Sequence, residues 1–373
     1  MDAEASRKAQ GQLYIQYQAR LSPRSSLFQW PENLDLLAAQ VGLDTVLFNG
    51  KETHPSNDEY DRVFLKQLVK RIEQAIEACT DDQAASLDTE KQDLTVDDAI
   101  LERYMRLVSM PETPSIMGTR VPSPLYVHHY FPITTAKHHH DILGPCESVT
   151  FRQEGTAISQ GTTGLTTWEA SLRLAAHVVA SPHVWQKSDA CILELGSGAG
   201  FLGLVCARLF DTLPHTDAKL YLTDLEGQVL DRLRETAQLN NATRAHIEAL
   251  DWNDISTGDR DALERLRNMR PTCVLAADVV YDPTLISPFV DTLWVALQKR
   301  AHSGPQPFAL VASTVRNPDT YGQFLRTLES RQLRWKMMDL KQTTWPNLDL
   351  VLFPSVHNQK LEGVVSILHI EVS

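Results

Sequence analysis

The chain has 373 residues, with 35 lysines and arginines against 47 aspartates and glutamates, and a formal net charge of −12 at pH 7. This length exceeds that of a typical single domain and predicts one core domain with a substantial additional region. The acidic balance argues against direct binding of nucleic acid, because proteins that bind it gather lysines and arginines against the phosphates. Partners that carry basic segments, proteins above all, are favoured instead.

The cysteines and the apolar runs indicate the cellular setting. The five cysteines include no C-x-x-C pair and predict reduced thiols. The first residues are polar, and no run approaches the roughly 20 apolar residues that a membrane span requires. We therefore expect a cytoplasmic protein without a membrane partner.

Residues 1–150 are expected to form a mainly helical N-terminal region with a proline-rich linker. Apolar residues recur every fourth position over residues 60–76, which predicts an amphipathic helix. Residues 79–93 are polar and indicate a surface loop, and a second helix is predicted to begin with Thr95 as its N-cap. Residues 110–145 carry many prolines and predict an extended linker.

Residues 151–373 show short β-type runs that alternate with helical stretches, which is typical of a parallel sheet flanked by helices. The last two β-type runs have no helix between them and predict an antiparallel hairpin at one edge of the sheet. The predicted fold class is α/β, a Rossmann-like and mostly parallel sheet with an antiparallel C-terminal hairpin. The strands are predicted at residues 190–195, 219–223, 245–250, 272–277, 307–314, 333–340 and 364–372.

The run CILELGSGAGFLG, residues 191–203, is a buried strand that turns through glycines into a helix. Gly196 and Gly198 let the backbone approach a ligand closely, and the free N–H groups of the helix favour a polar or anionic group. Gly198, Gly200 and Gly203 also match the fingerprint of dinucleotide-binding proteins, so an NAD-dependent oxidoreductase is an alternative. A tight turn that binds nothing is the third interpretation.

Acidic residues follow three of the predicted strands, where ligands bind in open α/β sheets. Asp224 either accepts both hydroxyls of a ribose or caps the helix that starts near Gly227. Asp251 and Trp252 suit an adenine ring, although a tryptophan there is equally consistent with the core. Asp278 stands in the run Asp278-Val-Val-Tyr281, where capping by the aspartate and packing by Tyr281 are the alternative to a role in the site.

Glu194-Leu-Gly-Ser-Gly198, Asp224, Asp251-Trp252 and Asp278-Val-Val-Tyr281 together resemble the seven-β-strand S-adenosylmethionine-dependent protein lysine methyltransferases. Within that class, Gly161-Thr-Thr-Gly-Leu-Thr-Thr-Trp168 and Ala277-Asp-Val-Val-Tyr-Asp-Pro283 are most similar to the elongation factor 2 lysine methyltransferases. The resemblance implies methylation of a lysine on elongation factor 2, with S-adenosyl-L-methionine as the cofactor.

The resemblance also implies the site residues. Asp278 and Tyr281 would hold the acceptor amine, with the carboxylate orienting its nitrogen and the phenol offering a hydroxyl and a ring face. Glu194 would help to anchor the methionine end of the cofactor. The full set expected to contact the cofactor is Trp168, Glu194, Gly196, Ser197, Gly198, Gly200, Asp224, Leu225, Asp251, Trp252 and Ala277.

Two further interpretations concern binding rather than methyl transfer. A non-catalytic adaptor would bind S-adenosylmethionine and recruit a translation factor through the N-terminal region. The tract His138-His-His140 is interpreted as a solvated loop, because three contiguous rings do not converge easily on one ion. No metal ion is expected.

Overall fold

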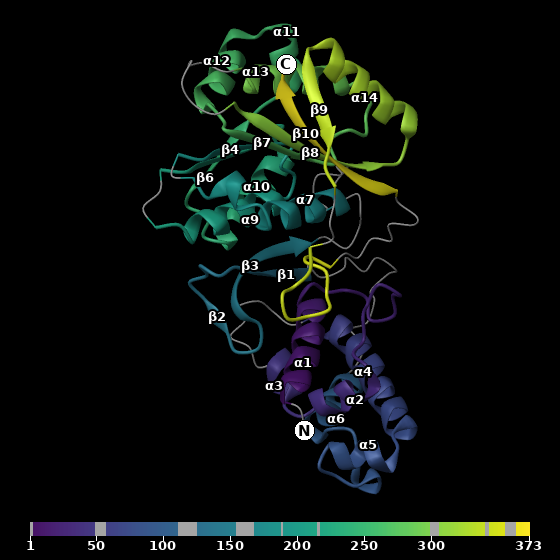
Figure 1. Ribbon diagram of the computed structural model, residues 1–373. Coiled ribbons are helices and arrows are strands. Elements are labelled where there is room, and N and C mark those ends of the chain that lie inside the picture. The colour runs from purple at the N-terminus through teal and green to yellow at the C-terminus, as the bar shows by residue number, and fades with distance from the viewer. Residues whose placement is uncertain are drawn as a thin grey trace, which may run out of the picture. The chain divides into compact units, whose positions relative to one another are not determined.

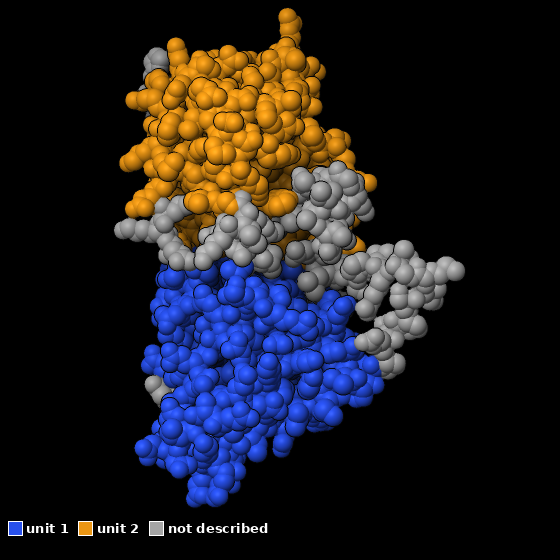
Figure 2. All heavy atoms as spheres, turned by 90° about the vertical axis from the view of Figure 1, so that its right-hand side faces the viewer, with its two compact units in different colours: residues 1–134, 138–146, 344–356 blue, residues 135–137, 147–343, 357–373 orange. Residues whose placement is uncertain are grey.

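The computed structural model describes residues 3–48, 57–110, 125–153, 168–187, 189–214, 217–298, 306–339, 343–354 and 363–373. The chain forms two compact units, which Figure 2 colours separately. Unit 1 comprises residues 1–134, 138–146 and 344–356, and unit 2 comprises residues 135–137, 147–343 and 357–373.

A seven-stranded sheet forms the centre of unit 2, in the strand order β6-β5-β4-β7-β8-β10-β9 (Figure 1). The first five of these pair in parallel, while β10 is antiparallel to both β8 and β9. The predicted fold class is therefore confirmed, hairpin included. The strands are β4 (Cys191–Leu195), β5 (Lys219–Asp224), β6 (Ala245–Ala249), β7 (Cys273–Ala277), β8 (Phe308–Val315), β9 (Leu333–Met337) and β10 (Val364–Val372).

Helices cover both faces of this sheet, with α7, α9 and α10 on one face and α11 to α14 on the other (Figure 1). Every residue of β4 is buried for this reason, as expected of a central parallel strand, and Glu194 is the one charged residue in it. The helices are α7 (Glu169–Val179), α8 (Pro182–Trp185), α9 (Phe201–Asp211), α10 (Gln228–Leu239), α11 (Trp252–Thr257), α12 (Arg260–Met269), α13 (Ile286–Ala296) and α14 (Pro318–Ser330).

The strand order reverses between β4 and β7. From β4 the chain runs outward through β5 to β6, and then crosses to β7 on the other side of β4. At such a switch point the loops that follow the two central strands diverge, and the crevice between them is the usual binding place of an open α/β sheet. The glycine turn after β4 and Asp278 after β7 stand at this point.

Unit 1 is built mainly from helices around an aromatic and aliphatic core. The predicted amphipathic helix is confirmed as α4, whose Phe64, Leu68 and Ile72 are fully buried. Residues far along the chain join this unit, since the ring of Phe353 lies 5.8 Å from that of Phe131. The helices are α1 (Ala3–Gln18), α2 (Asn33–Ala39), α3 (Leu43–Phe48), α4 (Asp58–Ala78), α5 (Asp81–Ser86) and α6 (Asp98–Ser109), with a short 3-10 turn η1 (Lys91–Asp93).

Two local predictions in the N-terminal region were wrong. The N-cap of α6 is Asp97 rather than Thr95, because its carboxylate accepts from the N–H groups of Ala99 and Ile100. The segment predicted as a surface loop contains α5, which Thr80 and Gln83 stabilise through a reciprocal capping box.

The prediction of an extended linker over residues 110–145 also needs correction. Strands β1 (Leu125–Pro132), β2 (His139–His140) and β3 (Gly144–Gln153) form a second sheet in the order β1-β3-β2. Aromatic and β-branched residues after the prolines favour pairing over an isolated extended chain. The rest of the proline-rich segment, residues 111–124, lies outside the described residues. The predicted division at residue 150 falls within β3.

The histidine tract is more ordered than the predicted solvated loop. His139 and His140 form β2, and Nδ1 of His140 accepts from the N–H groups of Ile142 and Leu143. Within the described ranges, no cluster of three or more histidine, cysteine, aspartate or glutamate residues is arranged to hold a metal ion. No helix in the described part of the chain is long and apolar enough to cross a membrane.

Candidate active site

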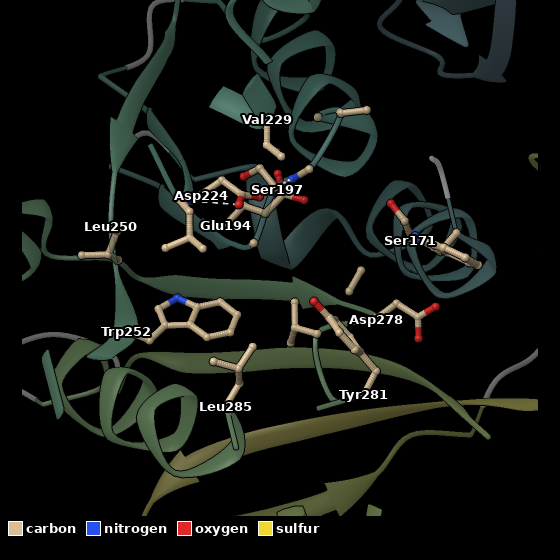
Figure 3. A pocket seen from close by; sticks show the side chains of 18 of the residues that line it. Ser171, Glu194, Ser197, Asp224, Val229, Leu250, Trp252, Asp278, Tyr281 and Leu285 are labelled. Atoms are coloured by element: carbon tan, nitrogen blue, oxygen red, sulfur yellow. Dashed lines mark hydrogen bonds between the residues drawn. The ribbon is translucent and has the colours of Figure 1, made fainter. Parts of the chain in front are cut away.

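A cavity of about 400 Å³ lies at the carboxyl ends of the central strands of unit 2 (Figure 3). Its size is that of a pocket for a cofactor or a small ligand. All the residues predicted to form the site line this one cavity, although the roles given to them stay predictions. They are Trp168, Glu194, Gly196, Ser197, Gly198, Gly200, Asp224, Leu225, Asp251, Trp252, Ala277, Asp278 and Tyr281.

The glycine turn after β4 is required by close packing. Gly200 begins α9 with a φ of +91°, and a Cβ atom there would overlap the side chain of Leu233. Gly203, one turn into α9, faces Leu222 of β5, and a Cβ atom would overlap that side chain and crowd the Glu194 carboxyl. The glycines therefore bring the start of α9 close to the sheet, where its free N–H groups can face a ligand.

Adding one methyl group at Gly200 is expected to affect both stability and cofactor binding. Gly200→Ala is expected to lower the free energy of unfolding by about 2–4 kcal/mol, from the left-handed backbone and the overlap with Leu233 together. It should also weaken binding of the cofactor, because either the Leu233 side chain or the start of α9 has to move beside the cavity. Gly258→Ala is the matched control, since Gly258 has a φ of +85° but nothing within 4 Å of a Cβ atom. Equal losses of cofactor affinity in the two variants, measured by titration, would contradict this account.

Asp224 connects the end of β5 to the glycine turn. Its carboxylate accepts from the N–H of Gly198 at 2.7 Å and from that of Leu225 at 2.8 Å. Burial raises the pKa of Asp224, and these two hydrogen bonds oppose the rise. The capping alternative was wrong, because the N-cap of α10 is Gly227 and no side chain caps that helix. Asp224 instead lines the cavity, as a ribose-binding acid requires.

Glu194 is a buried acid in β4 at the base of the cavity. Its side chain is only 2% exposed, and burial raises its pKa to about 8, helped by the charge of Asp224 and opposed by hydrogen bonds from Ser197 and Gly203. The carboxyl group is therefore mainly protonated at neutral pH in the protein alone. A cationic group placed beside it would favour the ionised form.

The raised pKa of Glu194 predicts how stability depends on pH. Between the ordinary pKa of 4.5 and the folded value of about 8, the folded protein keeps a proton that the unfolded chain has lost. Stability must therefore fall as pH rises through this window, by on the order of 3 kcal/mol between its lower end and pH 7. Glu194→Gln should abolish this slope, as denaturant unfolding on both sides of the window would show. If Glu194→Gln and the control Glu226→Gln both keep the wild-type dependence of stability on pH, the pKa of Glu194 is not the source of that dependence.

The side of the cavity suited to an adenine ring is apolar and flat. Trp252 starts α11 and packs on Phe289, with ring centroids 5.1 Å apart, so the predicted core and cavity roles coexist. Figure 3 shows Trp252 and Leu285 on the same side of the cavity. Asp251 is the N-cap of α11 and accepts from the N–H of Asn253 at 2.8 Å. Its remaining acceptor capacity lies where an amino group could reach it.

The other side of the cavity carries Asp278 and Tyr281. Asp278 follows β7 with a φ of +56°, a conformation that is uncommon for a residue other than glycine and that marks a locally constrained site. Tyr281 is 57% exposed, and Figure 3 shows its ring beside Asp278 with the hydroxyl directed into the cavity. The capping and packing alternatives for these two residues were wrong, because the N-cap of α13 is Leu285 and the Tyr281 ring is not buried.

Two residues at and just after the end of the fifth predicted strand, Thr314 and Arg316, were not identified from the sequence, and both contact Asp278. Thr314 donates its N–H at 2.9 Å and its hydroxyl at 3.1 Å to the Asp278 carboxylate. Arg316 donates two hydrogen bonds to the same carboxylate, and its Cζ lies 5.2 Å from the ring centroid of Trp168. Their position at the end of a predicted strand was the signal that could have identified them. Residues 161–167 of the predicted motif lie outside the described residues.

The cavity matches the chemistry of S-adenosyl-L-methionine. The glycines form a cradle that Cβ atoms would fill, Asp224 offers an acceptor for ribose hydroxyls, and Trp252 offers an apolar wall. Glu194 provides a buried acid near the turn, which a dinucleotide fingerprint does not require.

Comparisons with known proteins give a consistent result. A family model described as lysine methyltransferase matches residues 148–331. Protein-lysine N-methyltransferase EEF2KMT of Homo sapiens is 30% identical over 76% of this chain and 74% of its own length. The protein of the same name from Bos taurus is 27% identical over 81% of this chain and 78% of its own. Protein-lysine N-methyltransferase EFM3 of Chaetomium thermophilum is 28% identical over 70% of this chain and 69% of its own.

Proposed function

Because this chain belongs to the lysine methyltransferase family, we propose that it methylates a lysine of elongation factor 2. The family establishes protein-lysine N-methylation as the activity and S-adenosyl-L-methionine as the cofactor. It thereby replaces the oxidoreductase alternative. The choice of substrate is supported by similarity to EEF2KMT over three quarters of the chain and by the run Ala277-Asp-Val-Val-Tyr-Asp-Pro283. A translation factor as substrate would place the activity in the cytoplasm.

The observation that carries the assignment of the site is the convergence of all the predicted residues on one cavity. We assign Asp224 to the ribose, Trp252 to the adenine and Glu194 to the methionine end. When bound, the cofactor would supply a methyl group from its sulfonium sulfur, which would leave as a neutral thioether while the lysine nitrogen gains the methyl group and loses one proton. The tasks left to the protein are to orient the amine and to exclude water.

We assign the acceptor amine to the side of the cavity formed by Asp278 and Tyr281. The phenol of Tyr281 is exposed at the cavity and offers the amine a hydrogen-bonding group and a ring face. Asp278 lies beside it with a side chain that is 6% exposed, so its charge acts in a poorly solvated environment. We propose that unit 2, which contains most of residues 151–373, is the methyltransferase domain and that the N-terminal region adds contacts to the protein substrate.

The experiment that tests the substrate uses a cytosolic lysate without the endogenous activity, the purified chain and methyl-labelled S-adenosylmethionine. The proposal predicts a labelled band at elongation factor 2, with the label on lysine after peptide mapping. A labelled lysine on another protein would keep the activity and discard this substrate. Cofactor binding without any label would instead favour the non-catalytic adaptor.

A further inference from the structure

The carboxylate of Asp278 is fully occupied by groups of the chain itself. Its Oδ1 accepts from the Thr314 N–H and from one guanidinium nitrogen of Arg316 at 3.3 Å. Its Oδ2 accepts from the Thr314 hydroxyl and from the second guanidinium nitrogen at 3.1 Å. A carboxylate has about four acceptor positions, so an incoming amine finds none open unless a donor leaves.

The sheet fixes this arrangement. Ala277 of β7 pairs with Ala312 of β8, and the N–H of Asp278 continues the pairing by donating to the Ala312 carbonyl at 2.8 Å. Thr314 lies near the end of β8 and Arg316 directly follows the strand, two residues further along. Both side chains reach the Asp278 carboxylate, as expected for residues two positions apart in an extended chain. The Arg316 guanidinium is held from a second direction by the ring of Trp168.

The pairing of Asp278 with Arg316 changes the charge that an acceptor lysine would meet. A carboxylate alone beside an amine stabilises the protonated form, whose nitrogen has no lone pair to attack with. A guanidinium bound to that carboxylate through two hydrogen bonds cancels most of its field and stays charged at any relevant pH. Among the described residues, the other titratable groups that line the cavity are Glu194, Asp224 and Asp251, on its cofactor side, and Tyr281 beside Asp278.

We propose that Arg316 is a positioning residue that neutralises Asp278, so that the acceptor lysine lies beside Tyr281 as a neutral amine. Asp278 then orients Arg316 and the strand ends around the acceptor, rather than binding the amine as a free carboxylate. This inference builds on the proposed function, because it takes Asp278 and Tyr281 as the acceptor side of the cavity.

The test is the pH dependence of methyl transfer to full-length elongation factor 2 by the full chain. Arg316→Met removes the charge and keeps an extended side chain, which leaves Asp278 uncompensated. Its activity near neutral pH should fall roughly tenfold, and the rising limb of its pH profile should move about one unit to higher pH, so that activity recovers there. Arg316→Lys should keep the profile near that of the wild type. Cofactor affinity should change little in either variant.

A double variant separates charge from packing. Arg316→Met combined with Asp278→Asn carries no uncompensated carboxylate, so the alkaline displacement should disappear even if turnover stays low. Unfolding curves exclude variants that are misfolded, and Arg316→Gln serves as a second neutral substitution. An unshifted profile with reduced turnover, or a lower KM for the protein substrate that shows Arg316 to compete with the lysine, would overturn the inference. No transfer by the wild type would instead refute the proposed function.

Discussion

Replacing Asp224 with alanine is expected to weaken binding of S-adenosylmethionine by at least about a hundredfold, because the variant loses the carboxylate that we assign to two hydrogen bonds with the ribose hydroxyls. The same change removes the acceptors for the N–H groups of Gly198 and Leu225, so the glycine turn loses a constraint as well. Both effects act on the cofactor side of the cavity. Calorimetric titration of the purified protein measures the loss directly.

Two further variants show whether the loss comes from the ribose contact. Glu226→Ala removes an acid two positions along the chain whose side chain is 66% exposed and does not line the cavity, so its affinity should equal that of the wild type. Asp224→Asn keeps one acceptor oxygen and should show an intermediate loss. Wild-type affinity in Asp224→Ala, with an unchanged unfolding transition, would refute the assignment of Asp224 to the ribose.

Replacing Asp278 with asparagine is expected to separate binding from turnover. Cofactor affinity should stay within about threefold of the wild type, since we assign Asp278 to the acceptor side of the cavity that it lines. Methyl transfer should fall by on the order of a hundredfold or more, because Arg316 loses its partner and an uncompensated guanidinium faces the acceptor. Single-turnover transfer to the protein substrate, measured beside cofactor titration, gives both quantities.

Asp282→Asn is the control for this change. Asp282 belongs to the same loop, but it does not line the cavity, and its carboxylate is occupied by Thr284, whose hydrogen bonds lower its pKa. Removing that charge should leave transfer unaltered. Equal effects of the two substitutions would mean that the net charge of the loop matters and that Asp278 has no specific role.

The sequence was sufficient for the parts of the fold that depend on local patterns. Short β-type runs that alternate with helical stretches located the buried strands such as β4, and apolar residues at every fourth position located α4. Asp224, Asp251 and Asp278 were identified because each one follows directly after a predicted strand. In a parallel sheet all these ends meet at one edge, so Asp224 and Asp278 could be placed near each other without knowledge of the strand order.

The parts that were missed depend on pairing across the chain. Arg316 reaches Asp278 only because β7 and β8 are adjacent in register, which brings residues 38 positions apart together. The region of β1, β2 and β3 was interpreted as a linker because residues 110–145 carry many prolines, whereas the pairing of these strands has no local signal. The packing of Phe353 in unit 1 likewise has no local signal.

One measurement tests most directly whether this chain methylates a lysine of elongation factor 2 at this cavity. Purified elongation factor 2 that has never been methylated is incubated with S-adenosylmethionine and either the wild type or Asp278→Asn, and its peptides are mapped by mass spectrometry. We expect methyl groups on one lysine after incubation with the wild type and almost none after incubation with Asp278→Asn. An unmodified factor after incubation with a wild type that binds the cofactor would contradict the account, as would equal modification by both proteins.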